Sequence, residues 1–146
     1  GAGKSFGISQ QADQNIGFRV QDGVDIRFVD TLRDTPNFSP MKGEDWKEEE
    51  WMYIQLAPEG WVSYTFRIPE CSAEHAYSLE LYIRTMQGGA IAVSIDDTYI
   101  GTAAAKGESW EIVQVLLPNM LREGEHSIGL RAEELTSQIQ WIRILH

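Results

Sequence analysis

Hydrophobic and polar residues alternate with a period of two along several segments of the chain. No segment of twelve residues keeps the 3.6-residue period of a helix. In the segment 77–84, Leu79, Leu81 and Ile83 fall on one side of an extended chain, and Glu80 falls on the other. This alternation is typical of strands with one face in the core, and it predicts an all-β fold.

Nine segments show the strand pattern, and turn residues separate them. The expected strands span residues 24–29, 51–56, 61–68, 77–84, 90–96, 99–103, 110–117, 126–132 and 138–145. Tight turns are expected at 87–89, 96–98 and 122–125, where Gly or Asp is present. Nine or ten short strands in one domain predict a sandwich or barrel, and the stretch 30–50 is expected to be a loop.

Size and charge narrow the functional classes. The chain has 146 residues, 42% of them hydrophobic, which suffices for one core and predicts a single domain over residues 1–146. Its formal net charge of −10 argues against nucleic acid and anionic membrane surfaces as partners. No apolar run approaches the roughly 20 residues of a membrane-spanning helix, so membrane insertion is not expected. The single cysteine, Cys71, cannot form an intrachain disulfide.

The stretch 59–66, Glu-Gly-Trp-Val-Ser-Tyr-Thr-Phe, resembles the Gly-acidic-Trp-x-x-Tyr strand of family 6 carbohydrate-binding modules, with Gly and the acid exchanged. Weaker matches follow in that family's order at 15–26, 77–85, 95–102, 110, 121–124 and 139–142. The resemblance covers residues 15–145 and implies a galactose-binding-like β-sandwich jelly roll of antiparallel strands. It also implies a secreted, non-catalytic domain that brings an attached polysaccharide-active enzyme or cell-surface protein to a polysaccharide or oligosaccharide.

In the resembled family, two aromatic rings clasp a sugar at one end of the sandwich, and an Asn bonds its hydroxyls. Carried over, one ring falls on Trp110 and the amide on Gln138, which is one methylene longer than Asn. The opposing ring falls on Tyr53 or Trp51, and Tyr53 is favoured. Core packing is the alternative for Trp110 and Tyr53.

Three further tryptophans have two interpretations each. Trp46 lies in the acidic loop without a strand pattern to bury it, so it contacts a ligand or folds back over the sandwich. Trp51 and Trp141 lie in strand patterns, which favours core packing for both, although Trp51 remains a candidate for the sugar site.

Some members of the family also bind along the concave sheet face. Trp61 and Ser63 match the positions used there, and the alternation directs both away from the core. Glu80 and Tyr82 are directed outward from their strand as well, with Gln114 as a further candidate. The sequence therefore suggests a second site made of these side chains.

A structural calcium is common in the family, but its ligands are not evident in this chain. The nearest N-terminal candidates are Gln11 and Asp13, and Gln140 stands beside the tryptophan of the last strand, with Asp25 as another oxygen donor. Two of the 22 carboxylates at a separation of about 5–10 Å would suit a glycosidase, yet no catalytic motif appears, so an enzyme is not expected. The alternative function is a protein-interaction or structural β-sandwich of a secreted glycoside hydrolase.

Overall fold

The computed structural model describes residues 6–7, 25–29, 47, 51–70, 76–117 and 121–145. These residues form ten strands and one 3-10 turn. The strands are β1 (Phe6–Gly7), β2 (Asp25–Phe28), β3 (Met52–Leu56), β4 (Trp61–Ile68), β5 (Ser78–Thr85), β6 (Ala90–Ile95), β7 (Thr98–Ala104), β8 (Glu111–Leu116), β9 (Gly124–Ala132) and β10 (Ser137–Leu145), and the turn is η3 (Met86–Gly88). The all-β prediction is confirmed, since each predicted strand is present within two residues of its expected bounds. Apart from Lys47, the expected loop lies outside the described residues.

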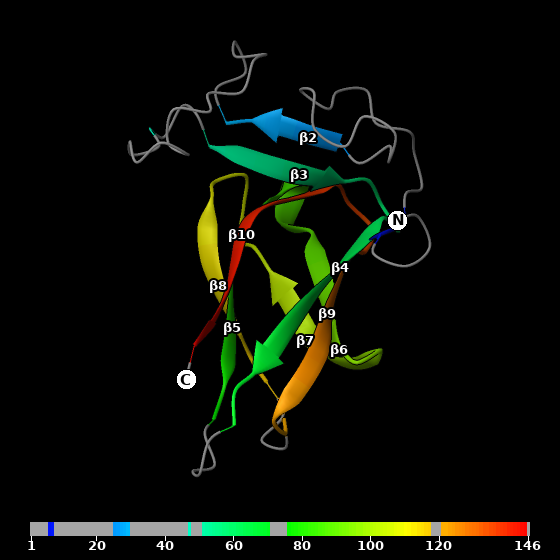
Figure 1. Cartoon of the computed structure of the whole chain (residues 1–146). Helices are drawn as coiled ribbons and strands as arrows, with labels where there is room; N and C mark the ends of the chain where they lie inside the picture. The colour runs from blue at the N-terminus through cyan, green and yellow to red at the C-terminus, as the bar shows by residue number, and fades with distance from the viewer. Residues whose placement is uncertain are drawn as a thin grey trace.

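Two five-stranded sheets face each other (Figure 1). The β4 sheet has the order β1-β4-β9-β6-β7, and the β5 sheet has the order β2-β3-β10-β5-β8. Every strand pair is antiparallel. The chain crosses between the sheets repeatedly, so strands adjacent in the sequence, such as β9 and β10, lie in opposite layers. None of the described residues form a helix long and apolar enough to span a membrane.

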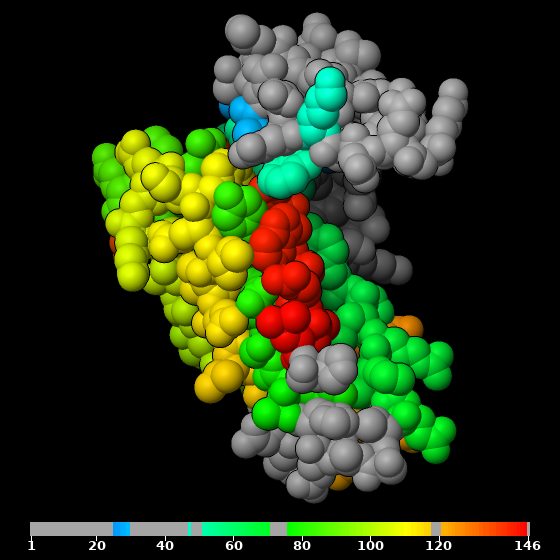
Figure 2. Space-filling view, turned by 90° about the vertical axis from the view of Figure 1, so that its left-hand side faces the viewer, coloured from blue at the N-terminus to red at the C-terminus, as the bar shows by residue number. Residues whose placement is uncertain are grey.

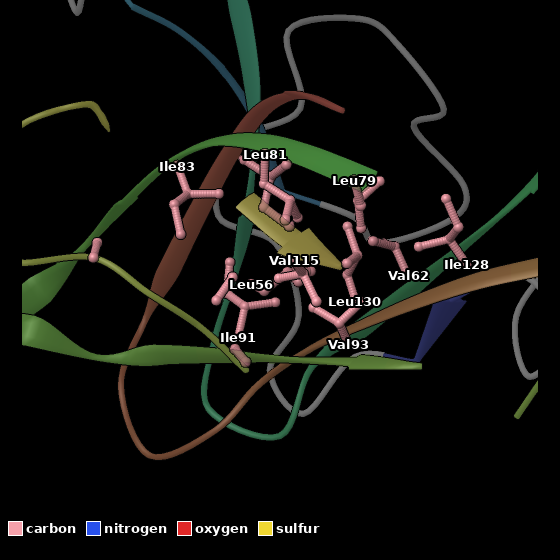
Figure 3. Packing of buried hydrophobic residues seen from close by; sticks show 14 of the residues in the cluster. Leu56, Val62, Leu79, Leu81, Ile83, Ile91, Val93, Val115, Ile128 and Leu130 are labelled. Atoms are coloured by element: carbon pink, nitrogen blue, oxygen red, sulfur yellow. The ribbon is translucent and has the colours of Figure 1, made fainter. Parts of the chain in front are cut away.

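The core lies between the sheets. Leu81 and Ile83 from the β5 sheet meet Ile91, Val93 and Leu130 from the β4 sheet, and all five are completely buried (Figure 3). Each such side chain contributes about 1.5–3 kcal/mol relative to an exposed position. The predicted alternation of 77–84 thus corresponds to the inner and outer faces of β5.

Tyr64 departs from the predicted pattern of β4. It lies on the same side of the strand as the buried Val62, yet it is 38% exposed. It borders a cavity of about 310 Å³ whose other walls come from β2, β3 and β10, including Met52 and Ile54. The inner face of β4 is therefore not uniformly packed.

A β-bulge in β10 reverses the orientation of its second half. The register shifts between Ile139 and Trp141, so that Trp141 lies opposite Tyr82 on the outer face of the β5 sheet. Ile142 and Ile144 then turn inward and pack against the core. An extra residue in one strand produces this change of side.

The predicted turn between β6 and β7 is tied to β9 through a carboxylate. Asp96 and Asp97 have positive φ angles of 47° and 64°, as in the turns that favour Asp at these positions. The Asp96 carboxylate accepts hydrogen bonds from His126 Nδ1 at 2.7 Å and from the Ser127 backbone N–H at 2.8 Å. These two bonds, in that order, lower the pKa of Asp96.

Candidate functional site

Three aromatic rings form a row on the outer face of the β5 sheet. Tyr82 on β5 lies 5.4 Å between ring centroids from Trp110, which directly precedes β8, with a tilt of 34°. It also lies 5.4 Å from Trp141 on β10, with the ring planes 25° apart. All three side chains are partly exposed. Figure 2 shows this side of the molecule, with β10 (red) and β8 (yellow) at the surface.

The strand pattern places each ring of this aromatic row. Tyr82 alternates with the buried Leu81 and Ile83, so it points outward. Ile112 lies opposite Tyr82 and is exposed. Trp110 comes two residues before Ile112 and therefore points to the same side. Trp141 reaches the same face through the β10 bulge. Core packing for Trp141, expected from its strand position, is therefore wrong.

Tyr53 contacts Trp110 directly. The two rings meet edge to face, with centroids 5.5 Å apart and planes at 64°, and Tyr53 is only 6% exposed. A sugar between two aromatic faces needs about 7–8 Å, because each carbon contact takes 3.5–4 Å. The gap expected between these rings is not present, and Tyr53 instead buttresses the Trp110 indole.

Four directly opposed residues carry a chain of hydrogen bonds across the same sheet. Arg84 Nε donates to Gln138 Oε1 at 2.6 Å, and Gln138 Nε2 donates to Gln55 Oε1 at 2.8 Å. Gln55 Nε2 donates to Asp25 Oδ2 at 3.0 Å, and Asp25 also forms an ion pair with Arg27 at 2.8 Å. We call Arg84, Gln138, Gln55 and Asp25 the amide chain. It fixes polar groups beside Trp110, with the Arg84 guanidinium carbon 5.0 Å from the indole centroid.

Glu80 lies at the other end of the aromatic row and is fully engaged. Arg143 Nε donates to Glu80 Oε2 at 3.0 Å, and Gln114 Nε2 donates to Glu80 Oε1 at 2.8 Å. These two donors, Arg143 first, lower the pKa of Glu80 below its ordinary 4.5. The Arg143 guanidinium carbon also lies 5.2 Å from the Trp141 ring centroid. This carboxyl group is therefore held in its ionised form.

The structure brings together most of the residues proposed from the sequence for the sugar site. Trp110, Tyr53 and Gln138 converge on the outer face of the β5 sheet. Trp51 lies just before β3 and is 38% exposed, so core packing is wrong for it. Trp46 lies outside the described residues.

The proposed second site does not form as one surface. Trp61 and Ser63 lie on β4, whereas Glu80 and Tyr82 lie on β5 in the opposite sheet. Both pairs face away from the core, and the sandwich therefore separates them. Alternation identifies the outer side of each strand but not the sheet to which the strand belongs, so grouping these four residues was wrong.

Sequence reasoning missed three contributors to this face: Trp141, Arg84 and Gln55. The outward position of Arg84 follows from the alternation of β5, so its side was predictable. Its neighbours were not, because they come from β10 and β3, which are distant in the sequence. Trp141 required knowledge of the bulge.

No group of three or more potential metal ligands occurs among the described residues. Gln11 and Asp13 lie outside them, and Asp25 is committed to Arg27 and Gln55. Carboxylate oxygens available for calcium are therefore not gathered in the described part of the chain.

Comparison with known proteins identifies the fold. No protein-family model matches the chain, and no curated protein matches it by sequence. A carbohydrate-binding module from Cellvibrio mixtus lichenase 5A, solved with cellotriose, is 22% identical with a TM-score of 0.52, over 65% of this chain and 77% of that one. The C-terminal CBM6 of a marine laminarinase from Zobellia galactanivorans is 19% identical with a TM-score of 0.55, over 70% of this chain and 86% of that one.

A carbohydrate-binding module of family 36, solved with calcium and xylotriose, is 13% identical with a TM-score of 0.51, over 63% of this chain and 79% of that one. The chain thus has the β-sandwich fold of family 6 and family 36 carbohydrate-binding modules.

Proposed function

We propose that this chain is a non-catalytic carbohydrate-binding domain. The observation that carries the proposal is the row of Trp110, Tyr82 and Trp141 on a solvent-facing sheet. The C–H groups on a sugar face pack against aromatic rings, and burying about 100 Å² of apolar surface contributes roughly 2–3 kcal/mol per ring. The amide chain beside the row supplies fixed hydrogen-bonding groups for hydroxyls.

The domain serves a larger protein that acts on glycans. In support, the similar modules come from a lichenase and a laminarinase, and their sandwich is shared by this chain. Such a protein meets polysaccharide outside the cell, so we propose an extracellular or cell-surface location. The ligand is a polysaccharide or oligosaccharide chain long enough to cover more than one ring.

The state of Glu80 supports a binding role over catalysis. A glycosidase needs one carboxylic acid that keeps its proton near neutral pH, which requires a raised pKa. Glu80 is a carboxylate beside the aromatic row, and Arg143 and Gln114 lower its pKa. It is therefore suited to orient neighbouring groups and not to donate a proton.

Native gel electrophoresis in the presence of soluble β-glucans, xylan or agarose tests the proposal. We expect retardation by at least one polysaccharide, with a dissociation constant in the millimolar to micromolar range. Trp110→Ala should weaken binding about thirtyfold, since one ring contact is lost. Trp110→Phe keeps a ring and should retain part of the affinity, while Trp61→Ala, on the opposite sheet, should bind like wild type.

Unchanged mobility of the wild type across the whole panel would contradict carbohydrate binding. Loss of binding in Trp61→Ala but not in Trp110→Ala would move the site to the outer face of the β4 sheet, where Trp61 and Ser63 lie. Thermal unfolding of each variant establishes that it is folded before its binding is compared.

A second candidate function is protein docking. Strand β8 forms an edge of the β5 sheet, and its outward Ile112 and Leu116 are exposed, Leu116 by 79%. Apolar side chains on an exposed edge suit a protein partner. Capture of the parent glycoside hydrolase by the isolated chain, abolished by Leu116→Asp, would support this role.

A structural calcium also remains a proposal for this fold. The similar family 36 module was solved with calcium, and the candidates Gln11 and Asp13 lie outside the described residues. Addition of calcium should raise the midpoint of thermal unfolding, and EDTA should reverse the effect. Identical midpoints with calcium and with EDTA would contradict it.

A further inference from the structure

Arg84 lies beside the aromatic row and has no acidic partner among the residues that the structure describes. The ion pairs that bind Arg27 to Asp25, Arg131 to Glu59 and Arg143 to Glu80 satisfy other arginines of the chain. In the described part of the chain, Arg84 has no carboxylate within ion-pair distance. The positive charge of this partly buried side chain therefore has no neutralising carboxylate among the described residues, although the net charge of the protein is −10.

The guanidinium of Arg84 is held in a fixed orientation. Its carbon lies 5.0 Å from the Trp110 ring centroid and 5.9 Å from the Tyr53 ring centroid, and its Nε is committed to Gln138. Its two terminal nitrogens have no hydrogen-bond partner among the described residues. They form the planar fork that binds carboxylate or sulfate through two parallel hydrogen bonds.

The amide chain determines which atom of Gln138 meets Arg84. Asp25 is a carboxylate and only accepts hydrogen bonds, so Gln55 must direct its NH₂ group toward Asp25 and its oxygen toward Gln138. Gln138 then directs its NH₂ group toward Gln55 and its oxygen toward Arg84. The orientation of Arg84 is thus anchored across four strands, from the β2 edge of the sheet to β5.

A second arginine in a similar position on the same face does have an acidic partner. Arg143 lies over Trp141 at 5.2 Å, much as Arg84 lies over Trp110, but Glu80 neutralises Arg143. The arginine beside Trp141 is therefore paired with a carboxylate, whereas the arginine beside Trp110 is not paired with one among the described residues. The ring of Trp110 can pack against a sugar while the adjacent fork holds an anionic substituent.

Resting on the proposed carbohydrate-binding function, we propose that the site around Trp110 recognises an acidic sugar, whose carboxylate or sulfate is held by the terminal nitrogens of Arg84. The net charge of −10 repels a densely charged polyanion. The ligand is therefore a mostly neutral glycan with sparse acidic residues, and a uronic acid branch on a neutral backbone has this chemistry.

Matched ligand pairs test the proposal by isothermal titration calorimetry with the full chain. The pairs are a neutral xylo-oligosaccharide and the same oligosaccharide with one glucuronic acid or one sulfate ester, and a cello-oligosaccharide with and without an oxidised C6. We expect an acidic member to bind at least about tenfold more tightly than its neutral partner, because a charge-assisted bidentate contact is added. Raising the salt concentration should weaken only the acidic member. The carboxylate and sulfate arms show which anion is preferred.

Variants distinguish the effect of the Arg84 guanidinium fork on binding from the effect of the protein's net charge. Arg84→Met should bring the acidic ligand down to the affinity of its neutral partner, and Arg84→Lys should keep only part of the preference, because the charge remains without the fork. Arg131→Met makes the same change of net charge on the opposite sheet and should keep the full preference. The Arg84→Lys variant keeps the test valid if Arg84→Met fails to fold.

Equal binding of acidic and neutral partners by the wild type, or a preference that survives in Arg84→Met, would overturn this inference and leave carbohydrate binding intact. Absence of binding to every saccharide would contradict the proposed function itself.

Discussion

The contact between Asp96 and His126 predicts a pH-dependent contribution to stability. His126 Nδ1 lies 2.7 Å from Asp96 Oδ2, and His126 Nε2 lies 2.8 Å from the carbonyl oxygen of Arg122. Both partners accept hydrogen bonds, so the imidazole satisfies both only when each ring nitrogen carries a proton. The hydrogen bonds to Asp96 and then to Arg122 accordingly raise the pKa of His126 above its ordinary 6.5.

The pH range in which this contact stabilises the fold follows from the raised pKa of His126 and the lowered pKa of Asp96. The part due to His126 is complete below pH 6.5 and is lost as the pH rises through the raised pKa of the folded protein. The part due to Asp96 is complete above pH 3.8 and is lost as the pH falls through its lowered pKa. The contact therefore stabilises the fold most strongly between pH 3.8 and 6.5.

The stabilisation that the Asp96–His126 contact provides is limited by the solvent exposure of Asp96. A hydrogen bond to a charged group contributes about 1.5–3 kcal/mol, but the Asp96 side chain is 50% exposed, and solvent reduces the contribution toward that of a surface ion pair. We expect Asp96→Asn to lower the free energy of unfolding by about 1 kcal/mol at pH 5.5. For a chain of this length, this corresponds to about 3 °C in the midpoint of thermal unfolding.

Thermal unfolding followed by circular dichroism at pH 5.5 and pH 9 measures this difference. The deficit of Asp96→Asn should shrink by more than half at pH 9, because His126 has then lost its charge. Asp97→Asn is the matched control: it makes the same charge change in the same turn, and no side-chain hydrogen bond joins Asp97 to another described residue. Equal deficits of Asp96→Asn at both pH values, or the same pH profile in Asp97→Asn, would refute this reasoning.

Three further predictions concern stability and are measured by urea unfolding. Leu81→Ala should cost about 2–5 kcal/mol because Leu81 is completely buried, whereas Leu116→Ala, on the surface, should change stability by less than about 0.5 kcal/mol; similar losses would contradict the assigned core. Thr85→Val should leave stability unchanged or raise it by about 1 kcal/mol, because the buried Thr85 hydroxyl has no partner among the described residues; a loss of stability would reveal a partner. Gly124→Ala should cost about 1–3 kcal/mol because Gly124 has φ of 129°, whereas Gly107→Ala, with open space around the added carbon, should not destabilise.

The fold was predictable from local patterns because burial between two sheets imposes alternation on each strand separately. The strand 61–68 was predicted with its observed bounds, and its outward Trp61 and Ser63 were assigned to the correct side. The turn at Asp96 was equally local, since its residue types and position between two strands suffice. These features depend on neighbours in the sequence and not on strand order.

The site was predictable only in part because it depends on which strands become neighbours. Trp110 and Gln138 were candidates from the sequence, and they lie on the same sheet face. The contact of Gln138 with Arg84 was not predictable, because it joins β10 to β5 and alternation carries no information about that pairing. Core packing of Trp141 was expected from its strand position, and the β10 bulge that turns it outward has no signal in the alternation. The ring gap between Tyr53 and Trp110 depends on side-chain packing across strands, which the sequence pattern does not specify.

The amide chain has a consequence for how the recognition surface can change. Because Asp25 accepts a hydrogen bond, Gln55 and then Gln138 each direct an oxygen toward β5, where the oxygen of Gln138 meets Arg84. A neutral residue at this edge position would remove the acceptor that fixes Gln55, and only the Nε–H of Arg84, which donates, would then hold the oxygen of Gln138 in place. A single substitution distant from the rings would thereby loosen the polar groups beside Trp110 while leaving the shape of the surface intact.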